Sequence, residues 1–223
     1  CEIAAPESFF FLGHSSPMNS SAAGSWSLGL GRWCGVEIRL HIHFPLVVLW
    51  AFLLAAWSQH EVLAIKISLA DVAAAVFVLL ASVTIHELVR LVVARRVGGH
   101  TSMIVIGPTG GWVRPSLPAD PPAHLVTALA GPVVYLALAV AAACLLVVQG
   151  QKDVLPLLSP FAPEFAISDS AFPVLHQVAQ LTVWINFCLL LINLIPVQPC
   201  DAAELLHGML CPLVGRSSAA TAL

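Results

Sequence analysis

The chain has 223 residues, of which 59% are hydrophobic and only 9% are charged, and its mean hydropathy is +0.92. Soluble domains carry about a quarter of charged residues, so this composition places the chain among integral membrane proteins that lie in a lipid bilayer. The net charge of -3 gives no support for a nucleic-acid partner. The six cysteines form no CxxC pair and therefore indicate neither a cysteine zinc site nor a disulfide framework.

The N-terminal part of the chain changes character near residue 30. Residues 1–30 are rich in Ser, Gly and Ala, and we expect them to be disordered. Residues 35–43 alternate polar and apolar side chains, which predicts a strand. The apolar run 44–57 follows and contains two tryptophans, as is typical of a span near a membrane interface, although it is short.

Three longer apolar runs have the length of a membrane span. They cover residues 72–97, 124–148 and 174–195. Between the first two of these, residues 101–114 are β-branched at first and then rich in glycine, which predicts a short strand, a turn and a second extended piece. The expected fold is an all-α membrane protein of about four transmembrane helices, with a short extended β insertion after the second span.

The domain boundaries follow from the same pattern. We expect residues 31–212 to form one membrane core and residues 213–223 to form a C-terminal tail, and whether the chain is truncated there stays open. The positive charges predict the orientation, because Lys and Arg gather on the cytoplasmic side. Six arginines flank one side of the expected spans, whereas the other side carries only Lys66 and Lys152. The N-terminus and the side that carries the candidate site are therefore predicted to be cytoplasmic.

Three ionisable residues interrupt the second span. His86, Glu87 and Arg90 lie in an otherwise apolar helix, where charged groups are costly and often functional. His-Glu also opens the motif H-E-x-x-H, in which two histidines bind zinc and the glutamate acts as general base. Here the motif reads His86-Glu87-Leu88-Val89-Arg90, so the second histidine is replaced by an arginine.

The order of four short motifs carries a family resemblance. They are His86-Glu87 within a span, Gly107-Pro108-Thr109-Gly110-Gly111 in the next extended segment, Ala130-Gly131-Pro132 at the start of the third span, and the segment from Asn193 to Asp201, NLIPVQPCD. Over about residues 30–210 the chain resembles the site-2 protease family of membrane-embedded zinc metalloproteases. The family pattern for the last segment is N-x-x-P-x-x-P-x-D-G.

The resemblance implies a role for each matching residue. His86 corresponds to the first zinc ligand, Glu87 to the general base and Asp201 to the third zinc ligand. Asn193 corresponds to a residue that supports the substrate or the oxyanion. The segment with Gly110 and Gly111 corresponds to one that lies near the active site and pairs with an unwound substrate strand. The implied activity is intramembrane proteolysis, the hydrolysis of transmembrane protein substrates by a zinc-activated water.

Two departures from the family pattern bear on that activity. Arg90 occupies the position of the second ligand, and Ala202 replaces the glycine after the aspartate. A guanidinium does not deprotonate in proteins and has no lone pair to donate to a metal, whereas a catalytic zinc normally holds three protein ligands. We therefore hypothesise that Arg90 pairs with Glu87 and Asp201 and replaces the metal structurally.

Structural interpretations of these residues remain open at this point. His86 and Glu87 also fit a purely structural polar pair, and Asp201 fits the N-cap of a short helix. His100 and His207 are alternative zinc ligands only if the fold brings them to the same metal. His41 and His43 share one face of a strand and suit either a metal or a membrane interface. Asn186 and Asn193 fall on one helix face and suit hydrogen bonds between helices.

Two hypotheses for the function follow. The chain is either a protease with an altered metal site or a non-catalytic pseudoprotease that binds transmembrane helices or an active partner. The missing ligand favours the second, because only a bound metal lowers the pKa of the attacking water. A transporter fits poorly, because the chain has no paired broken helices of the kind that transporters use.

Overall fold

The computed structural model describes residues 26–33, 35–58, 68–113, 115–118, 120–166, 172–196 and 200–214. Within these ranges the protein is mostly helical and carries one small sheet. The helices are α2 (His43–Ser58), α3 (Leu69–Arg96), α4 (Pro121–Val148), the short 3-10 helix η1 (Leu155–Leu158), α5 (Pro173–Asn193) and α6 (Asp201–Val214). The strands are β1 (Ser27–Trp33), β2 (Val36–His41) and β3 (Met103–Ile106).

Three helices in the described ranges are long and apolar enough to cross a membrane, namely α3, α4 and α5. They coincide with the three long apolar runs of the sequence, and their ends differ from the expected ones by a few residues. The short first run forms α2, an apolar helix of 16 residues. At 1.5 Å per residue α2 is about 24 Å long, less than the ~30 Å of a hydrocarbon core. Three of the about four expected spans are therefore confirmed as helices long enough to cross a membrane, and the first run forms a shorter apolar helix.

Local sequence sets both ends of α3. The Ser68 hydroxyl accepts a hydrogen bond from the backbone N–H of Asp71, and the Asp71 carboxylate accepts one from the backbone N–H of Ser68, which makes a capping box. Arg95 and Arg96 lie in the last turn, where positive charge suits the helix dipole. Gly98 then adopts a φ of 84°, a left-handed conformation that ends the helix. The ionisable residues of α3 thus lie within a helix of fixed extent.

The sheet joins segments from two parts of the chain. β1 pairs antiparallel with β2, and β2 pairs parallel with β3, so that Ile38 lies opposite Ile104. The strands predicted within residues 35–43 and 101–114 are confirmed as β2 and β3. β1 was not predicted, and its first residues belong to the segment that was expected to be disordered. The local sequence of β1 has no strand pattern. Its residues form a strand because their backbone N–H and C=O groups find hydrogen-bond partners in β2. The remaining residues of that segment, 1–25, lie outside the described ranges.

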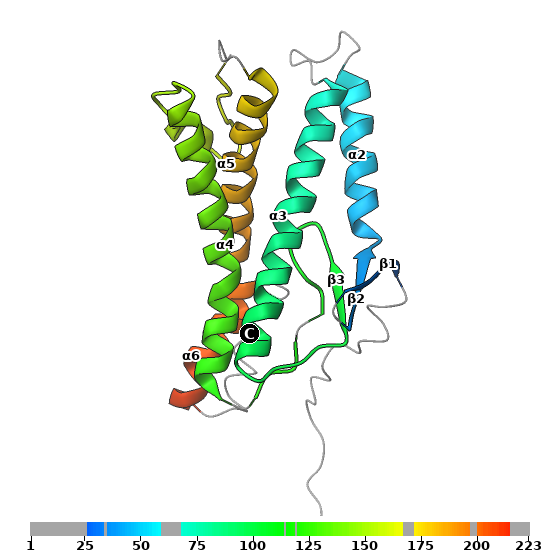
Figure 1. Cartoon of the computed structure of the whole chain (residues 1–223), viewed down its shortest axis with the longest axis vertical. Coiled ribbons are helices and arrows are strands. Elements are labelled where there is room, and N and C mark those ends of the chain that lie inside the picture. The colour runs from blue at the N-terminus through cyan, green and yellow to red at the C-terminus, as the bar shows by residue number, and fades with distance from the viewer. Residues whose placement is uncertain are drawn as a thin grey trace, which may run out of the picture.

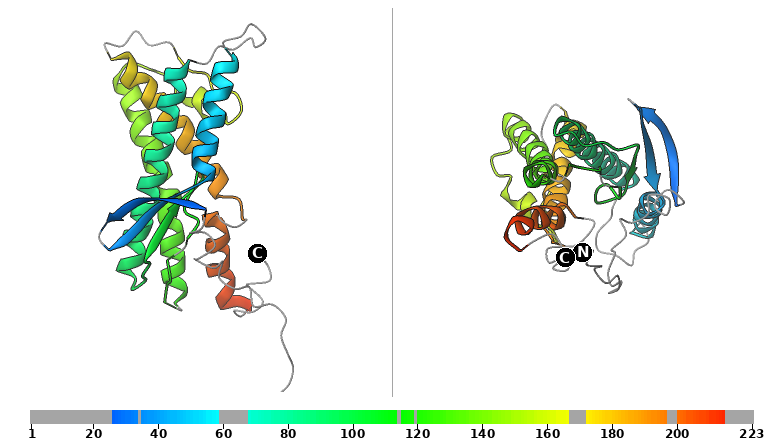
Figure 2. Two further views of the ribbon diagram at one scale, coloured as in Figure 1. Left: turned by 90° about the vertical axis from the view of Figure 1, so that its right-hand side faces the viewer. Right: turned by 90° about the horizontal axis from the view of Figure 1, so that it is seen from below.

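α3 lies at the centre of the molecule. α4 and α5 pack along one side of it, and α2 and the sheet lie along the other (Figure 1). α6 packs against α4 near the end of the bundle at which the sheet lies (Figures 1 and 2). The lower part of α3 is therefore covered by the sheet on one side and by α4 and α6 on the other.

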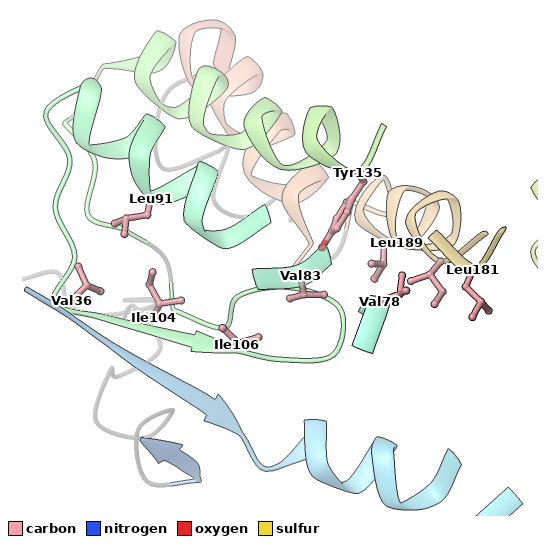
Figure 3. Close-up of a cluster of buried hydrophobic side chains, with 10 residues drawn as sticks. Val36, Val78, Val83, Leu91, Ile104, Ile106, Tyr135, Leu181 and Leu189 are labelled. Atoms are coloured by element: carbon pink, nitrogen blue, oxygen red, sulfur yellow. The ribbon is translucent and has the colours of Figure 1, made fainter. Parts of the chain in front are cut away.

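Two kinds of element share the hydrophobic core around α3. Val36 of β2 and Ile104 and Ile106 of β3 belong to the same buried cluster as Val83 and Leu91 of α3 (Figure 3). Tyr135 of α4 and Leu181, Ile185 and Leu189 of α5 complete this cluster from the opposite side. Because both sides pack on α3, the positions of the sheet and of α4 are fixed relative to the ionisable residues between them.

Candidate functional site

α3 brings three ionisable side chains into the interior of the bundle. His86, Glu87 and Arg90 are only 1%, 5% and 2% exposed. Residues three and four apart in a helix are neighbours on its surface, so Arg90 lies one turn away from both His86 and Glu87. Charged groups at this depth are stable only with close partners.

The first turn of α6 supplies acidic partners. Asp201 and Glu204 are both buried, and as residues three apart they lie on the same face of α6. Asp201 Oδ2 lies 2.9 Å from His86 Nε2, and Asp201 Oδ1 lies 3.2 Å from Arg90 Nη1. Arg90 Nη2 donates to Glu204 Oε2 at 2.5 Å. One guanidinium therefore joins two carboxylates of α6, as its planar fork of donors allows.

Glu87 faces the glycine-rich segment that follows β3. Its Oε1 atom accepts a hydrogen bond of 2.6 Å from the backbone N–H of Gly111. The same oxygen lies 3.0 Å from His86 Nδ1 and 4.0 Å from Arg90 Nη1. A Cβ atom at Gly111 would overlap the Glu87 carboxylate, so the contact requires glycine. Gly110 lies beside it with a φ of 152°, which also favours glycine.

Asn193, at the end of α5, holds the same segment in place. Its side-chain amide donates to the carbonyl oxygen of Thr109 at 3.1 Å and to that of Leu189, within α5, at 2.9 Å. Asn193 is buried, and its Oδ1 atom lies near Gly110. Asn193 of α5 and Glu87 of α3 thus both hydrogen-bond to the glycine-rich segment.

α4 closes the site from the remaining side. The ring of Tyr135 stacks on that of His86, with ring centroids 4.5 Å apart and an angle of 6° between the planes. A Cβ atom at Gly131 would overlap both His86 Nε2 and Asp201 Oδ2. The backbone of α4 therefore approaches the His86–Asp201 pair as closely as a glycine permits.

The structure brings together all the residues that the sequence analysis singled out for the site. His86, Glu87, Arg90 and Asp201 form one connected group, and Gly110, Gly111 and Asn193 border it. Arg90 contacts Asp201 directly and lies at the edge of ion-pair distance from Glu87, as its proposed pairing with both requires.

Three residues of this site were not predicted as members of it. Tyr135 and Gly131 come from α4, and Glu204 comes from α6. Glu204 was recognisable as a second acid one helical turn after Asp201 in an apolar segment. Gly131 was noted only as part of a family motif, and no local pattern identifies Tyr135, because its contact with His86 depends on how α4 packs against α3.

Other histidines lie apart from this group. His100 is exposed and forms an isolated β-bridge with Ser116. The side chain of His207 is outside the described part of the chain. His41 and His43 have their Nδ1 atoms 2.7 Å apart, and both rings stack on Trp112. Asn186 makes the expected contact between helices, since its amide donates to Ser82 Oγ at 3.0 Å.

The donor set does not fit a catalytic zinc ion. Such a site uses three protein ligands, and the candidate donors in α3 and α6 are His86 and Asp201. The two are hydrogen-bonded to each other, and the guanidinium of Arg90 lies against the second oxygen of Asp201. Among the described residues, no group of three or more His, Cys, Asp or Glu side chains is arranged to hold a metal ion. A positive charge thus occupies the position where the family pattern has a ligand.

A pocket borders this group on the sheet side. It is lined by Glu87, Arg90 and Leu91 of α3 and by Thr101, Ile104, Val113 and Pro115 of the segment around β3. Its empty volume, including the open mouth, is about 220 Å³. The lining is mostly apolar, and Glu87 and Arg90 border the pocket from the side of α3.

Comparison with known proteins agrees with this architecture. A family model described as Peptidase family M50 matches residues 74–222, which include most of α3, all of α4 to α6 and the ionisable group. The chain belongs to peptidase family M50. M50 is a family of zinc metalloproteases, and the resemblance to site-2 proteases that the motifs indicate is thereby confirmed.

A solved structure supports the same fold for this M50 member. The structure described as "Site-2 Protease from Methanocaldococcus jannaschii" matches with a TM-score of 0.61 and 22% sequence identity. The match covers 88% of this chain and 77% of that chain. No curated protein matches the chain. At this identity the likeness concerns the fold, and the chemistry of the site has to be argued from the residues of this chain.

Proposed function

We propose that this M50 member is a non-catalytic relative of the site-2 proteases, which binds transmembrane helices of a partner protein without cleaving them. The observation that carries the proposal is the position of Arg90. It is four residues after His86, in place of the second ligand, and it contacts the carboxylate that corresponds to the third ligand. The guanidinium of Arg90, which stays positively charged, therefore lies where a metal ion would need a neutral donor atom.

The other site residues support this proposal, because they form hydrogen bonds and ion pairs with one another. Glu87, which corresponds to the general base, accepts the N–H of Gly111, which corresponds to a substrate-binding position. Asp201 is engaged by His86 and Arg90. A general base must reach the proton that it removes, and Glu87 would first have to give up its partner in the glycine-rich segment.

The membrane placement belongs to the same proposal. α2 acts as a fourth, shorter span, and the excess of arginines near the sheet and α6 orients the site-bearing end toward the cytoplasm. Partner helices then approach from within the bilayer. Their recognition rests on the apolar surfaces of the helices and on the bordering segment that contains Gly110 and Gly111.

One observation favours a second candidate, a protease with an altered metal site. His86, Glu87 and Asp201 remain neighbours, with contacts of 2.9 Å and 3.0 Å between them. This arrangement retains the family's general base and two of its three ligands. The candidate requires a further donor to displace Arg90, and no described residue supplies one.

Cleavage and binding can be separated in one experiment. The parent, Glu87→Gln and the exposed control Glu164→Gln are each reconstituted in phosphatidylcholine vesicles with tagged single-span helical segments. Under the proposal, a subset of segments co-purifies uncut with all three proteins. Cleavage by the parent and by Glu164→Gln that disappears in Glu87→Gln would contradict it and establish the protease.

A further inference from the structure

Glu204 makes the shorter of the two contacts between Arg90 and α6. The distance from Arg90 Nη2 to Glu204 Oε2 is 2.5 Å, whereas that from Arg90 Nη1 to Asp201 Oδ1 is 3.2 Å. Glu204 has no counterpart in the ligand set that the family pattern implies. Glu204 is nevertheless buried, with only 7% of its surface exposed. Burial of a carboxylate costs free energy unless a nearby cation compensates its charge.

The two acids lie three residues apart in the first turn of α6, on one face of the helix. Arg90 reaches both, with a different nitrogen for each, and therefore bridges one position on α3 to two positions on α6. Besides the packing of α6 on α4, contact with Asp201 alone would give α3 a single point of attachment to α6. Contact with both acids fixes the helix in rotation and in depth, because the guanidinium is planar and its donors are rigidly spaced.

We infer that Glu204 is a positioning residue, which together with Arg90 and Asp201 forms a clamp that docks α6 on α3 without a metal ion. The inference rests on the proposed function, in which Arg90 takes the place of the second ligand. It adds that replacement of the ligand involves two residues: an arginine on α3 and a glutamate one turn beyond Asp201 on α6. In this interpretation the site is held closed by these ion pairs together with the packing of α6 on α4, without a metal ion.

Amide hydrogen exchange of α6 measures the docking directly. Residues 205–210 follow the first turn of α6, so their amides are protected by the helix and by its packing. In the detergent-purified protein, Glu204→Gln is expected to accelerate their exchange about tenfold or more, because it removes one of the two carboxylates through which Arg90 holds α6. The exposed Glu164→Gln serves as the matched control, and amides 180–189 of α5 report whether the bundle stays folded.

A double-mutant cycle distinguishes the clamp from a general packing role of Glu204. In an Arg90→Gln background, the clamp account expects Glu204→Gln to change exchange of α6 by less than about twofold, because its partner is already absent. The same acceleration in both backgrounds, or none in the parent background, would overturn the inference. If Glu204→Gln also accelerates amide exchange of α5, the variant that carries both Arg90→Gln and Glu204→Gln decides. Slow exchange of α5 in that double variant supports the pair, and fast exchange overturns it.

The clamp and the proposed function can fail separately. Exchange of α6 in the parent is measured with and without EDTA, and the clamp account expects no difference. Faster exchange with EDTA would mean that a metal docks α6 and would overturn the clamp. Cleavage of the tagged segments that is lost in Glu87→Gln, alongside an intact double-mutant coupling, would overturn the non-catalytic function and leave the clamp standing.

Discussion

The side chain at position 90 determines which chemistry the buried group supports. A histidine there would complete the family's H-E-x-x-H pattern, whereas the guanidinium of Arg90 contacts Asp201 and Glu204 as a cation. Three carboxylates surround this one fixed positive charge, namely those of Glu87, Asp201 and Glu204. Arg90 is therefore expected to contribute to stability through its partners more than through its own packing.

Arg90→Ala tests this contribution. Removing one partner of a buried ion pair leaves the other uncompensated, so the variant is expected to lose about 3–5 kcal/mol of unfolding free energy. SDS titration of the detergent-purified protein, followed by circular dichroism, measures the loss. Arg96→Ala, at the exposed end of the same helix, is the control and is expected to change stability by less than about 0.5 kcal/mol. Equal stability of the parent and Arg90→Ala would argue against a structural role for Arg90.

Gly131 tests the close packing of α4 against the site. A Cβ atom there would overlap both His86 Nε2 and Asp201 Oδ2, so Gly131→Ala must push α4 away or separate the pair. Overpacking of this kind costs about 1–3 kcal/mol, which outweighs the usual gain of alanine over glycine in a helix. The same titration measures it, with Gly29→Ala as control, because a Cβ at Gly29 meets no atom within 4 Å. A more stable Gly131→Ala would show that the pair lies farther from α4.

At the scale of elements, the junction between β2 and α2 depends on a neutral histidine. His41 Nδ1 accepts a hydrogen bond of 3.3 Å from the backbone N–H of His43, the first residue of α2. Burial and the neighbouring His43 lower the pKa of His41 below its usual 6.5. The unfolded chain therefore takes up this proton more readily, and stability is lost as the pH falls below about 6.5.

His41→Asn separates this effect from other acid-dependent groups. The Asn side chain offers an acceptor oxygen near the position of Nδ1 and does not titrate, so the variant is expected to lose less unfolding free energy between pH 8 and pH 5.5 than the parent does. Two SDS titrations per protein, one at each pH, give the comparison. Identical losses in parent and variant would mean that His41 does not contribute to the pH dependence.

The elements differ in how far sequence alone predicts them. The long apolar runs predict α3, α4 and α5, because length and composition suffice for a span. β1 escapes prediction, because Gly29 and Gly31 weaken its strand signal and its order comes from pairing with β2. The contact between α3 and α6 joins residues more than 100 positions apart, so Asp201 was assigned to the site by family pattern alone. The sequence shows Glu204 as a second acid one turn after Asp201, but only the packing shows that this face of α6 meets Arg90.

At the scale of the whole molecule, the M50 scaffold encloses a buried ionisable group in which an arginine stands at the position of the second histidine of H-E-x-x-H. α3 is central, and the glycine-rich segment after β3, α4 and α6 each contact its ionisable group, while Asn193 of α5 binds the glycine-rich segment. The fold matches a solved site-2 protease structure with a TM-score of 0.61, and position 90 of this chain is an arginine. Under the proposed function, the arginine at this position removes the capacity of the site to hold a metal.

Zinc content tests this central claim most directly. The detergent-purified parent and Arg90→His are equilibrated with zinc, passed through a desalting column and analysed by mass spectrometry for metal. The account predicts that the parent retains almost none, whereas Arg90→His, with His86 and Asp201 as its other ligands, retains up to about one zinc per chain. About one zinc per chain in the parent would contradict the account and mean that residues other than Arg90 complete the ligand set.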